Sequence, residues 1–419
     1  CRGWDNAVPL PSDAPTWAYA LRSEGYDCAL SGKMHLIGPD RLHGFQDQLA
    51  YDPHGGGTED DAEARRLGLS SGGQHPIYLW RDGVPTAEEP WPSVKEARAG
   101  TGPMIAADDA MEEAALAYLR DPERKERPFA LCVGFVAPHF PFIVPEPYFS
   151  MYYPEHADLP DNPPGHLESL PEAAQRLRQA FGFEGYTDDE VRRARAAYYG
   201  LITYMDEKIG RLMDALEEQG LAENTVIIHT SDHGESLGEH GLWRKMNFYE
   251  QSARVPLQIS WPGVIPGGQR FDGATSLVDA TATILDVAGV SGRDLEHLRL
   301  DGDSLLPLMR GETSAWKDEA FTEHLAHGTD RARAMARQGD WKLCYSHGNP
   351  PDLELYDLSS DPGEFTNLAG APEHSDIQGR LLARIMEHWG DPDDLTEDIE
   401  MGQESRLMIR EVLGDSAIF

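Results

Sequence analysis

VIIHTSDHGESLGEHGLWRKMNFYEQSARVPLQISWPG, residues 226–263, is the segment that the rest of this chain is organised to support. It opens with the β-branched run 226–228, which is typical of a strand buried on both faces. That run ends in the tetrapeptide SDHG at 231–234, and a second apolar run at 255–259 predicts another strand. A strand, a polar loop and a second strand in this order indicate a site rather than a simple connection.

Asp232 and His233 directly follow the first of these strands. Ligands of open α/β sheets bind at the carboxyl ends of strands. A carboxylate and an imidazole are both common metal ligands, and Gly234 lets the backbone turn sharply behind them. An Asp-His pair in this place is also often only the N-cap of a following helix. The pair alone therefore leaves both interpretations open.

Other basic side chains follow predicted strands. The strand near residues 26–30 is followed by Lys33 and His35, which point the same way if the segment is extended and could face one anion. The apolar strand at 129–136 is followed by His139, which lies between two prolines. Lys245 lies in the polar loop after SDHG. Each of these residues alone is as easily a solvated lysine or a structural histidine.

Together, these motifs closely resemble the sulfatases of the alkaline phosphatase superfamily. The matching motifs, in chain order, are GKMH at 32–35, PHFP at 138–141, SDHG at 231–234 and GEHGLWRK at 238–245. The segments WKL at 341–343 and LYDL at 355–358 match the family's C-terminal signature. SGKMH, GPDRLHGF and the tail QESRL at 403–407 are most similar to choline-sulfatase-like members.

The resemblance implies an α/β fold with a large, mostly parallel sheet sandwiched by helices, alkaline-phosphatase-like, and a small C-terminal antiparallel sheet with a helix. Alternating strand and helix patterns agree with it. We expect a catalytic domain at 1–312 and a C-terminal subdomain with a tail at 313–419. The sequence predicts helices at 12–25, 106–119, from the capping box at Thr187 to Gly220, at 276–287 and at 377–389.

The resemblance also assigns roles. Asp232 and His233 resemble two ligands of a divalent metal, with Ca²⁺ favoured over Mg²⁺ or Mn²⁺. Lys33, His139 and Lys245 resemble the groups that bind the sulfate oxygens and assist the leaving oxygen, and His35 resembles the base or hydrogen-bond partner of the nucleophile. Fixed cations suit this chemistry because a transferred sulfuryl group spreads negative charge over its oxygens. We expect all six side chains to converge on one pocket at the carboxyl edge of the large sheet.

One part of the family pattern is missing. Sulfatases use a formylglycine made from the cysteine of C-x-P-S-R and two metal-binding aspartates of an earlier strand, and neither motif occurs in the 419 residues. We expect both to lie in a missing upstream segment, so the chain as given should not hydrolyse aryl sulfates. Two alternatives remain: a phosphonate monoester or phosphodiester hydrolase of the same superfamily, or a catalytically inactive sulfatase-like binding protein.

Composition limits the partners. The formal net charge of −36 argues against nucleic acid as a partner, because phosphate binding needs a basic face. No run of residues is long and apolar enough for a membrane helix. The expected substrate is a small anionic sulfate ester, either choline sulfate or a sulfated sugar, and a homo-oligomer is possible.

The Gly- and Pro-rich segment 51–102 is expected to be a loop at the pocket mouth. No secretory signal is visible in the sequence, which favours a cytoplasmic location.

Overall fold

The computed structural model describes residues 3–5, 8–38, 40–53, 79–80, 83, 87–291, 297–313 and 315–413. Its strands are β1 Asp27–Gly32, β2 Asp47–Ala50, β3 Arg98–Ala99, β4 Phe129–Gly134, β5 Ile143–Val144, β6 Ile227–Thr230, β7 Leu257–Ser260, β8 Glu319–His324, β9 Arg333–Gln338, β10 Trp341–Ser346 and β11 Asp352–Asp357. Its helices are α1 Trp17–Ser23, α3 Pro92–Lys95, α4 Pro103–Arg120, α5 Glu146–Ser150, α6 Glu172–Phe181, α7 Asp188–Glu218, α8 Glu250–Ala253, α9 Leu277–Val287, α11 Leu306–Met309, α12 Ser375–Trp389 and α13 Pro392–Leu413.

The parallel part of the sheet is built from β1, β2 and β4. β1 lies in the middle and pairs in parallel with β2 on one side and with β4 on the other. β6 and β7 form a separate antiparallel pair in which Ile228 is opposite Ile259. Ile227 packs in one cluster with Leu119 of α4, Leu131 of β4 and Leu216 of α7, which places β6 over the same helices as β4.

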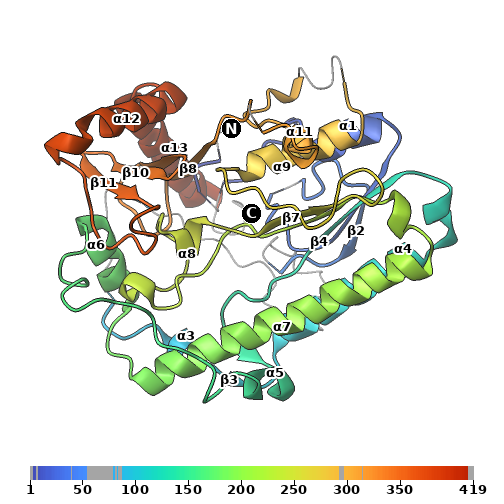
Figure 1. Cartoon of the computed structure of the whole chain (residues 1–419), viewed down its shortest axis with the longest axis horizontal. Helices are drawn as coiled ribbons and strands as arrows, with labels where there is room; N and C mark the ends of the chain where they lie inside the picture. The colour runs from blue at the N-terminus through green and yellow to red at the C-terminus, as the bar shows by residue number, and fades with distance from the viewer. Residues whose placement is uncertain are drawn as a thin grey trace.

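Helices cover both faces of this sheet (Figure 1). On one face α1 and α9 pack on β1 through Leu21, Leu30 and Leu285. On the other face α4 and the long helix α7 lie side by side, and Met111 of α4 packs with Ala50 and Val136. This arrangement confirms the predicted α/β class with a helix-covered parallel sheet.

The C-terminal part is the predicted antiparallel sheet with a helix. Its strand order is β11-β10-β9-β8, and α12 packs on β9 and β10 (Figure 1). Leu343 and Leu355 of the sheet contact Leu381 and Ile385 of α12 in a fully buried cluster. The boundary near residue 312 stays a prediction.

Local signals placed several elements correctly. Thr187 forms the predicted capping box with Glu190 at the start of α7, and Gly220 follows its end with φ +68°. Ser276 likewise caps α9. α1 begins later than predicted, because the Thr16 hydroxyl, and not Ser12 or Asp13, accepts from the backbone N–H of Tyr19.

Other expectations were wrong in part. β6 was expected to be buried on both faces, but its residues are half-buried and Thr230 is exposed. β9 and β10 are joined by a turn at Gly339, whose φ is +57°. Most of the predicted loop 51–102 lies outside the described residues, and its described part contains α3 and β3. Within the described ranges no helix is both long and apolar enough to cross a bilayer.

Candidate active site

Three parallel strands deliver polar residues to one edge of the sheet. Lys33 follows β1, Asp52 follows β2 and His139 follows β4. Because parallel strands end at the same edge, these residues lie near one another although they are far apart in the sequence. The Asp52 carboxylate accepts from the backbone N–H groups of Met34 (2.7 Å) and His35 (2.6 Å) and so fixes the turn after β1.

Gly134 allows the backbones of β1 and β4 to approach closely at this edge. The N–H of Lys33 donates to the carbonyl of Gly134 at 2.6 Å. A Cβ atom on Gly134 would lie 1.8 Å from the carbonyl oxygen of Lys33, which leaves no room for any side chain. Gly134 therefore allows the close backbone contact that fixes the position of the Lys33 backbone.

Lys33 reaches the residues that follow β6. Its ammonium lies 3.0 Å from Oδ2 of Asp232, and Nε2 of His233 lies 3.4 Å from the same oxygen. Nδ1 of His233 is 2.8 Å from the carbonyl oxygen of Gly234, a geometry in which Nδ1 carries the proton. The lone pair of Nε2 is then available on the side of Asp232, which is the arrangement a histidine metal ligand needs. No helix follows Asp232, so the N-cap interpretation was wrong.

Lys245 and His139 form the other half of the cluster. Nζ of Lys245 lies 3.0 Å from Nε2 of His139, and Nδ1 of His139 is 2.7 Å from the carbonyl oxygen of Phe140. The backbone contact favours a proton on Nδ1, so Nε2 accepts from the ammonium. The rings of His139 and His233 are 6.2 Å apart, which joins the two halves into one group.

The pKa values follow from this clustering. Partial desolvation raises the pKa of Asp232, but the charges of Lys33 and His233 outweigh it and hold that pKa well below its usual range. Burial, with repulsion from Lys33, lowers the pKa of Lys245 to about 8, although Asp232 and Glu235 oppose the shift. Burial, with repulsion from Lys245, likewise lowers the pKa of His233, which favours the neutral imidazole.

The loop that carries Lys245 is anchored from behind. The buried Glu235 carboxylate accepts from the backbone N–H of Arg244. The Arg244 guanidinium lies over the rings of Trp91 (4.6 Å) and Phe140 (4.4 Å), and Trp243 beside it is fully buried. Cation–π contacts in a desolvated place hold an arginine firmly. Lys245 therefore projects from a rigid support.

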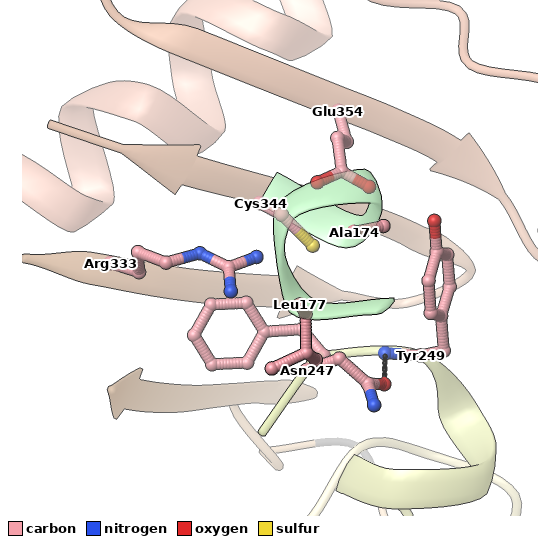
Figure 2. Close-up of a pocket in the computed structure, with 8 residues that line it drawn as sticks. Ala174, Leu177, Asn247, Tyr249, Arg333, Cys344 and Glu354 are labelled. Atoms are coloured by element: carbon pink, nitrogen blue, oxygen red, sulfur yellow. Dashed lines mark hydrogen bonds between the residues drawn. The ribbon is translucent and has the colours of Figure 1, made fainter. Parts of the chain in front are cut away.

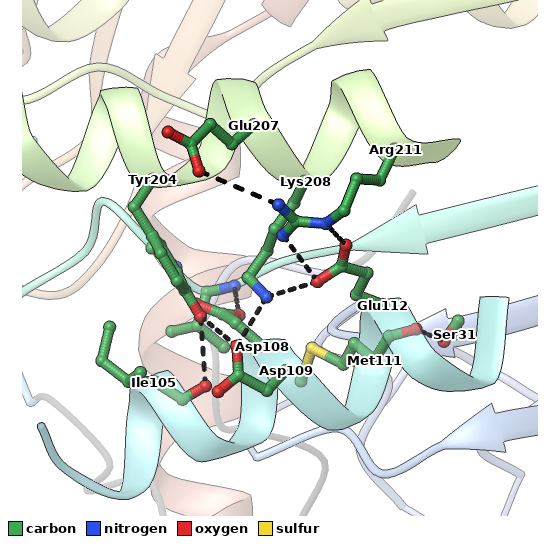
Figure 3. Close-up of polar contacts among 12 residues, drawn as sticks. Ser31, Ile105, Asp108, Asp109, Met111, Glu112, Tyr204, Glu207, Lys208 and Arg211 are labelled. Carbon is green, nitrogen blue, oxygen red and sulfur yellow. Dashed lines mark hydrogen bonds and ion pairs between the residues drawn. The ribbon is translucent and has the colours of Figure 1, made fainter. Parts of the chain in front are cut away.

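Helix α4 fixes the end of β1 and the segment after β4 through hydrogen bonds. The buried Asp108 accepts from the backbone N–H groups of Val136 (2.7 Å) and Ala137 (3.1 Å), just before His139. The hydroxyl of Ser31, near the end of β1, donates to the backbone carbonyl of Met111 in α4. Figure 3 shows α4 clamped to α7, where the Lys208 ammonium lies 2.6 Å from both Asp109 and Glu112.

We expect Asp108 to give the protein a measurable pH dependence. Burial raises its pKa to about 6, although two backbone N–H groups and Lys208 lower it and Asp109 raises it further. Because the pKa of Asp108 is higher in the folded state than in the unfolded state, protonated Asp108 stabilises the fold fully at pH values below the unfolded pKa near 4. This stabilisation is lost as the pH rises through 6. The loss amounts to roughly 3 kcal/mol, at about 1.4 kcal/mol for each unit of pKa.

The test is urea unfolding of Asp108→Asn and wild type between pH 5 and pH 7. The variant cannot titrate, so its stability relative to wild type should improve as the pH rises. Glu113→Gln, an exposed carboxylate of the same helix, is the control and should show no such trend. A constant difference between Asp108→Asn and wild type across this range would contradict the assignment.

The structure thus brings Lys33, His139, Asp232, His233 and Lys245 together through their side chains. His35 lies two residues beyond Lys33 with φ +58°, and its position is fixed by the backbone contact with Asp52. The functional roles of all six stay predictions. Asp52, Asp108, Glu235 and Arg244 were missed, because backbone N–H groups and aromatic faces that only the fold assembles are their partners.

Two further observations bear on the cluster. Within the described residues no group of three or more His, Cys, Asp or Glu side chains is placed to hold a metal ion. Asp232 and His233 offer one oxygen and one nitrogen donor 3.4 Å apart, which fits part of a coordination shell. A pocket lies elsewhere, between the C-terminal sheet and the segment after Lys245, and is lined in part by Asn247, Tyr249 and Arg333 (Figure 2).

Comparison with known proteins gives consistent matches. The profile of the family described as Sulfatase matches residues 3–290, and that described as N-sulphoglucosamine sulphohydrolase, C-terminal, matches residues 238–390. The chain is 33% identical to the choline-sulfatase of Rhizobium meliloti (strain 1021), over all of this chain and 80% of that protein.

Two further relatives are similar over different extents. An arylsulfatase of Clostridium perfringens (strain 13 / Type A) is 36% identical over 64% of this chain and 55% of its own length. The solved structure of a phosphonate monoester hydrolase from Silicibacter pomeroyi superposes with a TM-score of 0.71 at 26% identity. It covers 92% of this chain and 82% of that one.

Proposed function

The chain belongs to the sulfatase family and is a sulfuric ester hydrolase, and on that premise we propose that the Lys33–Asp232 and Lys245–His139 pairs form its sulfate-binding site. The observation that carries the proposal is the meeting of two ammonium groups, two imidazoles and a carboxylate at one sheet edge. In a protein of net charge −36, this local group of cations is what an anionic ester requires.

Each side chain has a role that its contacts support. Lys33 binds a nonbridging sulfate oxygen, with its position set by Gly134 and Asp232. His139 accepts from the Lys245 ammonium at Nε2 and so orients it. Lys245 donates to the bridging oxygen, where negative charge develops as the S–O bond breaks, so its contribution is largest in the transition state. The role of His35, assistance to the nucleophile, rests on the resemblance of its GKMH motif to that of sulfatases.

Asp232 and His233 would hold a divalent metal, with Ca²⁺ the first to test and Mg²⁺ and Mn²⁺ the alternatives. When bound, the metal supplies Lewis-acid stabilisation of the sulfate oxygens. The hydrogen bond from His233 Nδ1 to the Gly234 carbonyl supports the assignment because it leaves Nε2 as the donor atom. The proposed nucleophile is a formylglycine from outside the 419 residues, since no cysteine within them lies in C-x-P-S-R.

Two substrate classes fit this site. Choline sulfate is favoured by the similarity to a choline-sulfatase and by the acidity of the protein, which suits a quaternary ammonium group. A sulfated sugar is the other. The similarity to a phosphonate monoester hydrolase supports a second candidate activity, on phosphonate monoesters, because two ammonium groups suit either anion.

The test uses the full-length protein, meaning this chain together with the expected upstream segment that carries the nucleophile. Its parallel substrates are p-nitrophenyl sulfate, choline sulfate and p-nitrophenyl phenylphosphonate. We expect sulfate release to exceed phosphonate hydrolysis in kcat/KM and to stop when a chelator removes the metal. Added Ca²⁺, Mg²⁺ or Mn²⁺ should then restore it. A higher kcat/KM for the phosphonate would favour the second candidate, and no turnover of any of the three esters would overturn the proposed sulfate-binding site.

A further inference from the structure

Helix α8 supports the backbone on both sides of the candidate site. The Ser252 hydroxyl donates to the carbonyl of Lys245 at 2.7 Å, and the Ser252 carbonyl accepts from the N–H of Gly234 at 2.8 Å. Gly234 packs so closely that a Cβ atom there would lie 2.0 Å from the carbonyl oxygen of Gln251. A shift of α8 would therefore move both Lys245 and the segment beside His233.

A helix of four residues cannot hold its own position, because one turn is not stable by itself. α8 is instead fixed through its first residue to the C-terminal sheet. The N–H of Glu250 donates to Oε2 of Glu364 at 2.7 Å. The Glu250 carboxylate lies 3.0 Å from the Lys342 ammonium and 3.2 Å from the Arg337 guanidinium.

Lys342 joins these contacts from a fully buried position in β10. Its ammonium is 0% exposed and also lies 2.6 Å from Oε1 of Glu364, which is itself 0% exposed. Burial opposes its charge, but Glu364 and Glu250 outweigh burial and raise the pKa of Lys342. A buried ion pair rarely stabilises a fold more than apolar side chains of the same volume would. Stability alone therefore gives little reason for an ammonium here.

The contact surface next to α8 is incompletely filled. Figure 2 shows Asn247 and Tyr249, just before α8, facing Arg333, Cys344 and Glu354 of the C-terminal sheet across the pocket. The Tyr249 ring stacks on His240 with centroids 3.7 Å apart, and its centroid lies 6.2 Å from that of Tyr356 in β11, so it contacts both parts. Phe248 and Ala253 pack on Met335 and Cys344 beside this gap, and the ion pair of Lys342 with Glu250 adds a directional contact to α8.

We propose that Lys342, acting with Glu364, is a positioning residue that holds α8 through Glu250 and so sets the position of Lys245 and of the segment at Gly234. This role rests on the proposed function of Lys245. It assigns to the C-terminal sheet a part in catalysis, although that sheet contributes none of the six predicted site residues.

The first test is a double-mutant cycle in the full-length protein, with Lys342→Met made in the wild-type and Lys245→Ala backgrounds. Small misplacements of catalytic groups cost on the order of 10- to 10²-fold. We expect Lys342→Met to lower kcat by that factor with little change in KM in the wild-type background. In the Lys245→Ala background it should lower kcat by a smaller factor than in the wild-type background, because the part of the effect that acts through Lys245 is already lost and only the part that acts through Gly234 remains.

The control is Lys317→Met, which removes another ammonium that pairs with a buried carboxylate, 2.8 Å away on Asp279 of α9. Like Lys342→Met, it should lower the melting temperature, but it should leave kcat near that of wild type. If Lys342→Met does not fold, Glu250→Gln replaces it in the cycle. Glu250→Gln keeps the Lys342–Glu364 pair and the backbone bond to Glu364 and removes only the charge on α8.

The second test is independent of activity and measures amide hydrogen exchange at Gly234, whose N–H donates to Ser252. Lys342→Met or Glu250→Gln should speed this exchange tenfold or more, while Lys317→Met should not. Equal losses of kcat in both Lys245 backgrounds, or unchanged exchange at Gly234, would overturn the proposal. If Lys245→Ala itself kept full activity, the proposed function of Lys245 would fail, and the exchange result would still decide the link to α8.

Discussion

Lys245→Ala should lower kcat for an aryl sulfate by about 10²-fold or more in the full-length protein, the scale on which a single preorganised donor acts. The ammonium lies 3.0 Å from Nε2 of His139 and projects from a loop that Arg244 and Glu235 anchor. Charge on the bridging oxygen grows toward the transition state, so the loss should fall on kcat more than on KM.

Folding should survive this substitution. Lys245 is close enough to Lys33 for their repulsion to lower its pKa, so removing one of the two charges costs the fold little. Lys245→Arg should restore activity only in part, because a planar guanidinium cannot replace a compact ammonium between two oxygens. Steady-state kinetics with thermal melting measures both effects, and Lys95→Ala, an exposed lysine of α3, is the control. Wild-type kcat in Lys245→Ala would mean that this lysine is only a solvated loop residue.

Sequence reasoning succeeded where the determinants are local. The Thr187 capping box and Gly220 bound α7 because both signals act within one helical turn. β1 and β4 were predicted with their ends about two residues off, because an apolar run followed by glycine or proline is readable without the fold. The meeting of Lys33 with Asp232 was predicted because both follow strands, and strand ends share an edge.

Sequence reasoning failed where the partner of a side chain is a distant backbone group. Nothing near Asp108 indicates that its carboxylate accepts from Val136 and Ala137, since these amides belong to a separate strand end. Asp52 and Glu235 are similar cases. The motif at Lys342 was recognised as a C-terminal signature, but its contacts with Glu250 and Glu364 become visible only when α8 is placed against the sheet.

Asp232→Asn should abolish tight metal binding and lower kcat by about 10²- to 10³-fold, since a bound metal stabilises transition-state charge by several kcal/mol. Asparagine keeps the size of aspartate and one oxygen donor but loses the negative charge that a hard divalent cation prefers. It also leaves Lys33, which now lies 3.0 Å from Oδ2 of Asp232, without its ionic partner. The loss of the metal and the loss of the ion pair with Lys33 both affect the side chains that we propose bind the sulfate.

The measurement that separates metal binding from catalysis is the rise in melting temperature on adding Ca²⁺, Mg²⁺ or Mn²⁺ to chelator-treated protein, because a ligand that binds only the folded state stabilises it. We expect a rise for wild type and none for Asp232→Asn at the same concentration. Asp214→Asn, an exposed carboxylate on α7, is the matched control and should behave as wild type. A wild-type rise in Asp232→Asn would exclude this carboxylate as a ligand. If kcat were lost nonetheless, Asp232 would act on Lys33 alone, because their ion pair is the other contact that the substitution removes.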